Sequence, residues 1–270
     1  MNLFLDSGAY SAWTNRKPIS LKDYGKFILE HIEHFDAVAN LDVIPGEFGR
    51  RGTEAEREES ARLGFANYRK LIKMGVPKDK LMHIFHQDER FYWLEKMVEE
   101  TEYIGISPAN DRTVPKKRTW LDQCMKYVTD EKGYPKRKLH AFGLTSIPLL
   151  LRYPFFSCDS TSWLYMARYG AVFVPKHDGR SYTYLRSPYS IFFSTRSAAN
   201  SIEGKHYKTL STVEQKYLCN YIEEKGFKLE DAIESGTIRD QLNMMYYMDL
   251  EASLPKWPWR FKNNGQKSLF

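Results

Sequence analysis

The chain has 270 residues, of which 42% are hydrophobic and 15% aromatic, and its formal net charge is +6. This length and apolar content allow one or two domains with a substantial core. No apolar run reaches the roughly 18 residues that a membrane span requires. The first residues also lack the basic and then apolar pattern of a signal peptide. We therefore expect a cytoplasmic protein without a membrane partner.

The chain contains three widely spaced cysteines and no CxxC motif. This usage indicates a reducing compartment and argues against both a disulfide framework and a structural zinc site. Two histidine pairs, His31 with His34 and His83 with His86, have no carboxylate or cysteine beside them at ligand spacing. The sequence thus predicts neither a metal site nor a cofactor.

Strand and helix patterns alternate along the first two thirds of the chain. Short apolar runs predict strands at 2–9, 35–43, 81–87, 103–108, 138–144, 155–158 and 170–176. Amphipathic stretches predict helices between them, at 20–35, 53–74, 89–99, 120–128 and 163–169. Thr53 and Glu56 have the spacing of a capping box. This alternation predicts an α/β fold with a parallel sheet or a TIM-type (β/α)8 barrel, whose eighth strand would be Ser190–Ser194.

The alternation of strand and helix patterns ends at about residue 178. Residues 178–201 are rich in Tyr, Ser and Arg and predict a hairpin or a long loop, and helices are expected at 211–225, 229–235 and 237–250. We therefore expect a barrel domain over residues 1–200 and a mainly helical C-terminal extension over residues 201–270.

Polar side chains stand at or near the carboxyl ends of six successive predicted strands. They are Asp6, Asp42, Gln87, Ser107, His140 and Asp159. In a (β/α)-barrel these strand ends converge on one mouth, where catalytic groups collect. Three acids at one mouth would repel one another unless some are protonated, paired with a ligand or used in proton transfer. The simpler alternative for Asp159 alone is that it caps the helix that follows it.

Three motifs resemble those of the tRNA-guanine transglycosylases. Residues 6–10, Asp-Ser-Gly-Ala-Tyr, are similar to that family's Asp-Ser-Gly-(Gly/Ser)-(Tyr/Phe) motif, and residues 140–144, His-Ala-Phe-Gly-Leu, to its His-Leu-Phe-Gly element. Residues 158–163, Cys-Asp-Ser-Thr-Ser-Trp, are similar to the Asp-Ser-Ala-Ser-Tyr segment of its archaeal branch. The resemblance covers roughly residues 2–176, with the motifs in the family's order.

The resemblance implies a (β/α)8 barrel that exchanges guanine in a nucleic acid for another base. Asp159 would be the nucleophile that forms a covalent glycosyl-enzyme, and Asp6 the general acid and base. Asp42 and Gln87 would hydrogen-bond the edge of the base. The other predicted base-binding residues are Gly105, through its backbone, Tyr10, by stacking, and Ser107, His140 and Gly143.

The chain departs from the tRNA enzymes in having no Cys-x-Cys-x-x-Cys…His zinc motif. It also begins directly at the Asp6 strand, so we expect an irregular or incomplete closure of the barrel. Both features resemble the compact DNA-guanine transglycosylases of bacteriophages and DNA-modification gene clusters. That branch inserts a 7-deazaguanine such as preQ0 into DNA, which requires a flipped-out or single-stranded guanine.

The partners expected on this basis are DNA and a free 7-deazaguanine base, with a homo-oligomer or a helper protein left open. The candidate phosphate-binding residues are Arg50, Arg51, Lys116, Lys117, Arg118, Lys176, Arg180 and Arg186. A solvated charged face is the alternative for each of them. Two other functions also stay open: a tRNA-directed enzyme, and a non-catalytic subunit or module that only binds nucleic acid.

Overall fold

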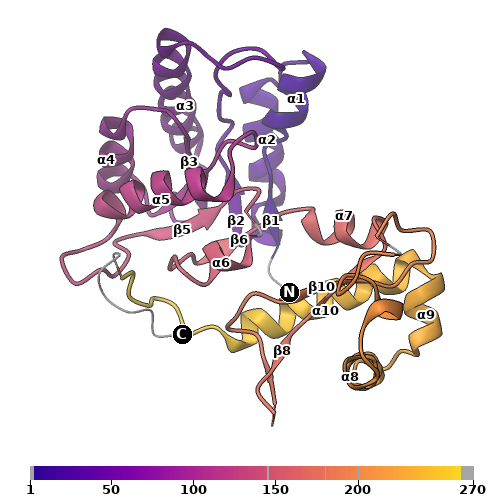
Figure 1. Cartoon of the computed structure of the whole chain (residues 1–270). Helices are drawn as coiled ribbons and strands as arrows, with labels where there is room; N and C mark the ends of the chain where they lie inside the picture. The colour runs from indigo at the N-terminus through magenta and orange to yellow at the C-terminus, as the bar shows by residue number, and fades with distance from the viewer. Residues whose placement is uncertain (1–2, 145, 180, 200, 263–270) are drawn as a thin grey trace. The chain divides into compact units, whose positions relative to one another are not determined.

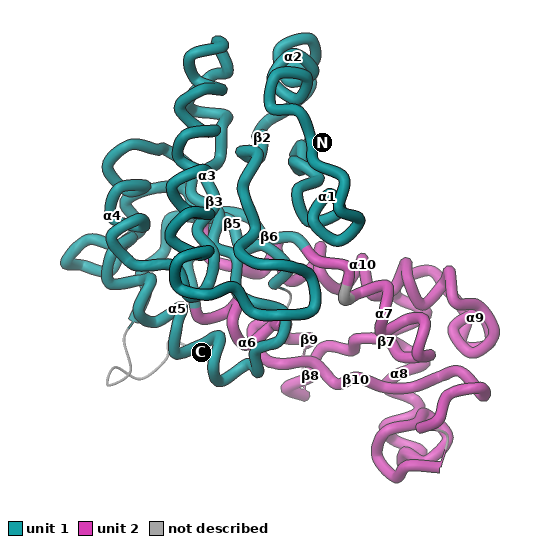
Figure 2. The backbone as a smooth tube through the Cα atoms, turned by 90° about the horizontal axis from the view of Figure 1, so that it is seen from above, with its two compact units in different colours: residues 1–144, 153–159, 257–266 teal, residues 145–152, 160–256, 267–270 magenta. Residues whose placement is uncertain are grey.

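The computed structural model of the chain describes residues 3–144, 146–179, 181–199 and 201–262 (Figure 1). The chain divides into two compact units (Figure 2). Unit 1 consists of residues 1–144, 153–159 and 257–266, and unit 2 of residues 145–152, 160–256 and 267–270. The domain boundary expected at residue 200 therefore falls inside unit 2.

Unit 1 is built on a six-stranded parallel sheet. Its strands are β1 (Phe4–Leu5), β2 (Ala37–Ala39), β3 (Leu81–His86), β4 (Tyr103–Ser107), β5 (Lys138–Ala141) and β6 (Ser157–Cys158). They lie side by side in sequence order, and the sheet curls into half a barrel. Parallel neighbours need a crossover between them, which the alternating helices provide. The predicted α/β class is confirmed, whereas these six strands do not by themselves make a complete eight-stranded barrel.

Helices connect the strands of unit 1 (Figure 1). They are α1 (Ala9–Asn15), α2 (Leu21–His31), α3 (Glu54–Met74), α4 (Phe91–Glu100) and α5 (Val114–Val128), with a short 3-10 turn at Ile32–His34. Helices α3 and α4 pack against β3, and α4 also packs against α5. The predicted capping box of α3 is confirmed, because Thr53 Oγ1 accepts from the Glu56 amide and the Glu56 carboxylate accepts from the Thr53 amide.

Helix α5 begins earlier than the sequence pattern indicated. The helix was predicted only over residues 120–128, but α5 starts at Val114, with Thr113 as its N-cap residue and Pro115 in its first turn. Proline is favoured in the first turn because the amide that it lacks has no helical partner there. Lys116, Lys117 and Arg118 therefore lie on the first turns of a helix and not on a flexible loop.

Unit 2 contains the remaining elements. They are α6 (Ile147–Leu150), α7 (Ser162–Arg168), β7 (Ala171–Val174), β8 (Lys176–His177), β9 (Tyr182–Thr183), β10 (Tyr189–Phe192), a 3-10 turn (Tyr207–Thr209), α8 (Thr212–Glu224), α9 (Leu229–Glu234) and α10 (Gly236–Ser253). The predicted helices α8, α9 and α10 are confirmed. Of the hairpin or long loop expected over 178–201, the structure has a short hairpin that begins earlier, in which β8 pairs antiparallel with β9. The predicted eighth barrel strand is wrong, because β10 pairs antiparallel with β7 in a separate two-stranded sheet.

The last part of the described chain returns to unit 1. Trp257 Nε1 donates a hydrogen bond of 3.1 Å to the Pro154 carbonyl, and the Phe261 amide donates one of 2.9 Å to the Gly133 carbonyl. The Phe261 ring also stacks on Tyr153, with 5.6 Å between the ring centroids. These contacts hold the segment that leads into β6. In the described part of the chain, no helix has both the length and the apolarity to cross a membrane.

Candidate functional site

The polar residues predicted at the strand ends all belong to unit 1 and lie at the carboxyl side of its sheet. Asp6 directly follows β1, Asp42 follows β2, Gln87 follows β3 and Asp159 directly follows β6. Because the strands are parallel and adjacent, their carboxyl ends share one edge. The sheet thus gathers these side chains as the sequence predicted.

Asp159 is an oriented carboxylate. Its Oδ1 accepts a hydrogen bond of 2.9 Å from the Gly143 amide and lies 3.3 Å from His140 Nε2. Desolvation by itself raises the pKa of Asp159, but the hydrogen bonds from His140 and Gly143 outweigh it, and the pKa is lowered. About half of the side chain remains exposed. Asp159 does not cap the next helix, since Thr161 is the N-cap residue of α7, so that alternative is wrong.

His140 connects Asp159 to two hydroxyl groups, those of Ser157 and Tyr103. Its Nδ1 lies 2.6 Å from Ser157 Oγ, which in turn hydrogen-bonds the hydroxyl of Tyr103. Because a carboxylate can only accept, the Nε2 atom of His140 donates to Asp159. The Phe4 ring stacks on the His140 ring at 5.1 Å between centroids. Hydrogen bonds at both ring nitrogens and the stacked Phe4 ring thus fix the imidazole, and its Nε2–H points to Asp159.

The Asp6 carboxyl has the opposite electrostatic environment. Desolvation raises the pKa of Asp6, and the negative charges of Asp42 and Asp159 raise it further, while the backbone amides of Ser7 and Gly8 partly oppose this. The residue nevertheless remains open to solvent. Two carboxyl groups whose pKa values shift in opposite directions can divide acid and nucleophile roles between them.

Asp42 belongs to a second cluster, of which sequence analysis found only part. Its Oδ2 lies 2.8 Å from His86 Nε2, and its Oδ1 accepts a hydrogen bond of 3.3 Å from Ser7 Oγ. His86 Nδ1 lies 2.9 Å from Glu89 Oε1. Burial alone lowers the pKa of His86, but Glu89 and Asp42 outweigh it and raise the pKa to about 10. The His-x-x-Glu spacing that starts at the last residue of a strand was the signal that could have identified Glu89.

The other predicted base-binding residues have varied surroundings. Gln87 is buried, and its Oε1 accepts a hydrogen bond of 3.0 Å from the Ala109 amide. Ser107 is the last residue of β4. Gly143 has a left-handed backbone conformation, with a φ of 57°. Tyr10 is exposed on α1.

Gly105 has a clear packing role within the sheet. It pairs with Ile84 on one side and with His140 on the other. A Cβ atom at position 105 would lie 2.4 Å from Phe142 Cε2. Glycine therefore makes room for the Phe142 ring. The predicted contact between its backbone and a base stays a prediction.

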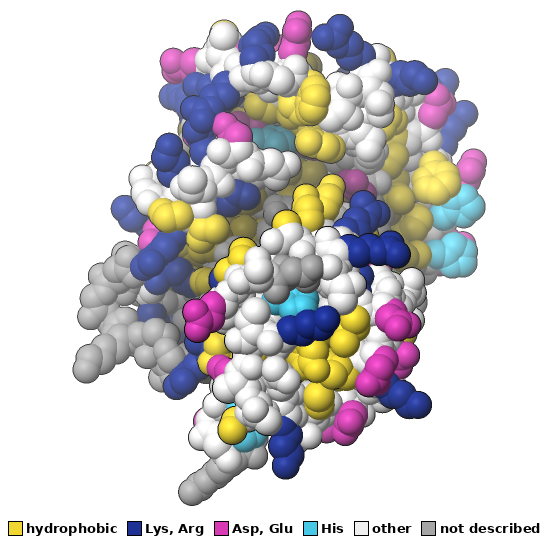
Figure 3. Space-filling model, turned by 45° about the vertical axis from the view of Figure 1, so that its right-hand side comes forward, with side chains coloured by type: hydrophobic (Ala, Val, Ile, Leu, Met, Phe, Trp, Pro, Cys, Tyr) yellow, Lys and Arg dark blue, Asp and Glu magenta, His cyan; other side chains and the backbone are white. Residues whose placement is uncertain are grey.

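Two of the predicted phosphate-binding residues of unit 1 are paired with carboxylates. Arg50 pairs with Glu56, and Arg51 pairs with Asp111 at 2.9 Å. Lys116, Lys117 and Arg118 lie on α5 as described above. Figure 3 shows Lys and Arg side chains interspersed with Asp and Glu on the face it presents. A phosphate bound at Arg50 or Arg51 would have to compete with these carboxylates.

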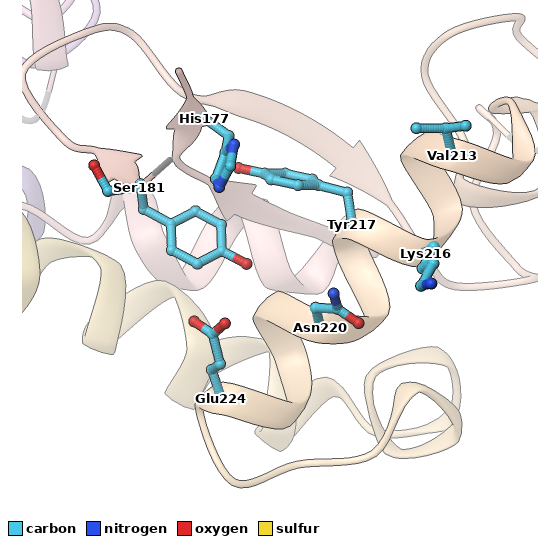
Figure 4. Close-up of a pocket in the computed structure, with 8 residues that line it drawn as sticks. His177, Ser181, Val213, Lys216, Tyr217, Asn220 and Glu224 are labelled. Carbon is cyan, nitrogen blue, oxygen red and sulfur yellow. The ribbon is translucent and has the colours of Figure 1, made fainter. Parts of the chain in front are cut away.

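The remaining basic candidates belong to unit 2. Lys176 lies 5.3 Å from the centroid of the Tyr189 ring, and Arg186 is exposed after β9. Arg180 lies outside the described residues. Unit 2 also has a hollow of about 490 Å³ between the β8–β9 hairpin and α8 (Figure 4). Its aromatic residues are His177, Tyr182 and Tyr217, and its polar residues are Ser181, Lys216, Asn220 and Glu224.

The described residues contain no group of three or more His, Cys, Asp or Glu side chains that could hold a metal ion. The carboxylates of the site instead face histidine rings and backbone amides. No model of a known protein family matches the chain, and no curated protein matches its sequence.

Proposed function

We propose that the protein is a DNA-guanine transglycosylase, which exchanges guanine in DNA for a 7-deazaguanine base of the preQ0 type. The observation that carries this proposal is the pair of carboxyl groups Asp159 and Asp6. Asp159 has a lowered pKa and is held by the Gly143 amide and His140, while Asp6 has a raised pKa. A double displacement at C1′ of a nucleoside needs one carboxylate as nucleophile and one carboxylic acid as proton donor.

In the proposed reaction, the Asp159 carboxylate attacks C1′ of the target nucleotide. The C1′–N9 bond breaks, Asp6 protonates the departing guanine, and a covalent glycosyl ester forms on Asp159. The incoming base then loses its proton to Asp6, and its nitrogen attacks C1′ and releases Asp159. The raised pKa of Asp6 suits this exchange because the group must both donate and accept a proton near neutral pH.

Asp42 and Gln87 are the proposed contacts to the base edge. Gln87 uses its Oε1 to accept from Ala109, so its amide NH2 is the part that would donate to a base oxygen. Asp42 would accept from the ring N–H and amino groups of the base. Within this proposal, the six-stranded sheet corresponds to the first six strands of the (β/α)8 barrel that the motif resemblance implies.

DNA is the proposed nucleic acid because the sequence lacks the zinc motif of the tRNA enzymes. We place the reaction in the cytoplasm, where the protein would encounter both DNA and a free 7-deazaguanine base. A guanine inside a duplex would have to be flipped out to reach the site. Phosphate binding by the basic candidates would make the affinity for DNA fall with salt.

The test is a base-exchange assay. The protein is incubated with DNA or with tRNA and with radiolabelled guanine or preQ0, and label in the nucleic acid is counted. We expect label in DNA for the wild type and its loss in Asp159→Ala and in Asp6→Ala. Asp79→Ala is the matched control, because Asp79 is an exposed acid in the turn before β3. A denaturing gel should show a covalent adduct with DNA that depends on Asp159.

Each alternative predicts a different outcome. Label that enters only tRNA would assign the enzyme to RNA. Binding of DNA without label or adduct, and with no effect of Asp159→Asn, would contradict the proposal and favour a non-catalytic nucleic-acid-binding subunit.

A further inference from the structure

The ring of His86 is held between two carboxylates. Its Nε2 lies 2.8 Å from Asp42 Oδ2, and its Nδ1 lies 2.9 Å from Glu89 Oε1. Ionised carboxylates only accept hydrogen bonds, and a neutral imidazole has a single N–H to donate. Both contacts are satisfied only when His86 is an imidazolium ion. The three groups then carry a combined charge of −1.

Glu89 is built into the fold as a buried anion. Its side chain is 1% exposed, and its second oxygen accepts a hydrogen bond of 3.2 Å from the His86 amide. The tight turn between the two residues places Asp88 at a φ of 79°, a left-handed conformation that non-glycine residues rarely adopt. Asp88 is held there by an ion pair of 2.6 Å with Arg112. The turn thus contains a strained backbone conformation at Asp88, and this conformation places Glu89 in contact with His86.

Asp42 is the member of this chain of charges that also acts electrostatically on Asp6. Its side chain is 9% exposed. His86 occupies Oδ2, while Ser7 contacts Oδ1 only at 3.3 Å. Rotation of the Asp42 carboxylate would break the His86 contact. One oxygen is therefore anchored, and the other is the one left to accept from a ligand.

We propose that His86 and Glu89 are positioning residues that hold the Asp42 carboxylate in one orientation, so that the site selects a base with an amide N–H next to an exocyclic amino group. This inference rests on the proposed function. A carboxylate with one oxygen anchored presents an acceptor to both donors of such a base edge. An Asp42 carboxylate that is free to rotate would not hold this acceptor against the amino donor. The site would then lose its preference for guanine over hypoxanthine, which lacks the amino group.

The titratable groups that interact electrostatically with His86 come from three segments. Asp42 follows β2, Glu89 lies in the turn after β3, and His83 lies on β3 itself. His83 is buried, and desolvation lowers its pKa to about 3, so it adds no charge near neutral pH. Glu89 and Asp42 thus dominate the field at His86.

The experiment has two arms, and the first does not depend on catalysis. Nitrogen-15 NMR of the imidazole rings reports whether both nitrogens of His86 carry protons at pH 8. We expect a doubly protonated ring in the wild type and a pKa lower by about 2 units or more in Glu89→Gln, which keeps an acceptor but removes the charge. Glu100→Gln is the matched control, because Glu100 pairs with Arg69 outside the site. A singly protonated His86 in the wild type would overturn the inference.

The second arm measures equilibrium binding of radiolabelled guanine and hypoxanthine to the full chain. We expect the wild type to prefer guanine and Glu89→Gln to reduce that preference about tenfold, with circular dichroism showing a folded protein. A preference that is unchanged in Glu89→Gln would overturn the specificity role while leaving the proposed function standing. A wild type that binds neither base would contradict the proposed function and the specificity role together, even where the first arm finds the imidazolium.

Discussion

His83 and His86 lie three residues apart on β3, and their surroundings shift their pKa values in opposite directions. His83 is enclosed by the aromatic rings of Phe65 and Tyr68, and desolvation lowers its pKa to about 3. For His86, desolvation is outweighed by Glu89, together with Asp42, and the pKa rises to about 10. Because side chains alternate along a strand, the two rings point to opposite faces of the sheet. One ring therefore belongs to the core and the other to the site.

The first prediction concerns stability at alkaline pH. The folded-state pKa of His86 is raised above its unfolded value, so its stabilising effect is present below about pH 6.5 and is lost as the pH rises through about 10. Urea denaturation should show a free energy of unfolding that falls by up to about 1.4 kcal/mol per pH unit in this window. His86→Gln should flatten this dependence, whereas His34→Gln, at an exposed histidine, should not. An identical slope in wild type and His86→Gln would contradict the assignment.

The second prediction concerns the acid limb of catalysis and rests on the proposed function. His140 and the Gly143 amide lower the pKa of Asp159, so the nucleophile stays ionised into the acid range. His140→Phe keeps a ring beside Phe4 but removes the donor to Asp159. The acid limb of kcat/KM should then move to higher pH by about 1 unit. An acid limb that does not move would mean that another group controls it.

A third prediction tests the contact between β4 and the Phe142 ring. In Gly105→Ala, the new Cβ would lie 2.4 Å from Phe142 Cε2 and 3.1 Å from Met82 Sδ. Overpacking of this kind should destabilise the protein by about 1–3 kcal/mol, as measured by urea denaturation. Adding Phe142→Leu should recover part of the loss, because it removes the ring edge that clashes. Full stability of Gly105→Ala alone would argue against this packing.

The fourth prediction compares two helix N-caps in unit 1. Thr53 caps α3 with its side chain, whereas Thr113 at the start of α5 makes no side-chain cap hydrogen bond. Thr53→Ala should therefore cost about 1 kcal/mol of stability, and Thr113→Ala should cost much less. Thermal or urea denaturation of the two variants measures the difference. Equal losses would contradict the assigned caps.

The strand order of unit 1 was predictable because apolar runs and amphipathic stretches alternate, and this alternation requires parallel neighbours. The clustering of Asp6, Asp42 and Asp159 followed from the same rule, since each comes after the carboxyl end of a strand. The pairing of β10 with β7 was not predictable in this way. A four-residue apolar run has the same pattern in parallel and antiparallel pairs, and only tertiary structure decides between them.

Two other features were missed for different physical reasons. The start of α5 was predicted six residues too late, at residue 120, although Thr113 and Pro115 are ordinary signals for the start of a helix. Glu89 was predicted to be the first residue of the helix after β3, but it lies in the turn before α4 and pairs with His86. This pairing depends on the left-handed backbone conformation of Asp88. Sequence alone rarely reveals such a conformation at a residue other than glycine.

The return of the C-terminal segment to unit 1 has a consequence for how the protein is made. Trp257 and Phe261 contact Pro154, Gly133 and Tyr153, and thus support the segment that leads to Asp159. A ribosome would complete the six strands about a hundred residues before it releases these two aromatic residues. The Asp159 segment of the nascent chain therefore lacks these contacts until residues 257 and 261 have left the ribosome, and the site reaches its final geometry only after that point.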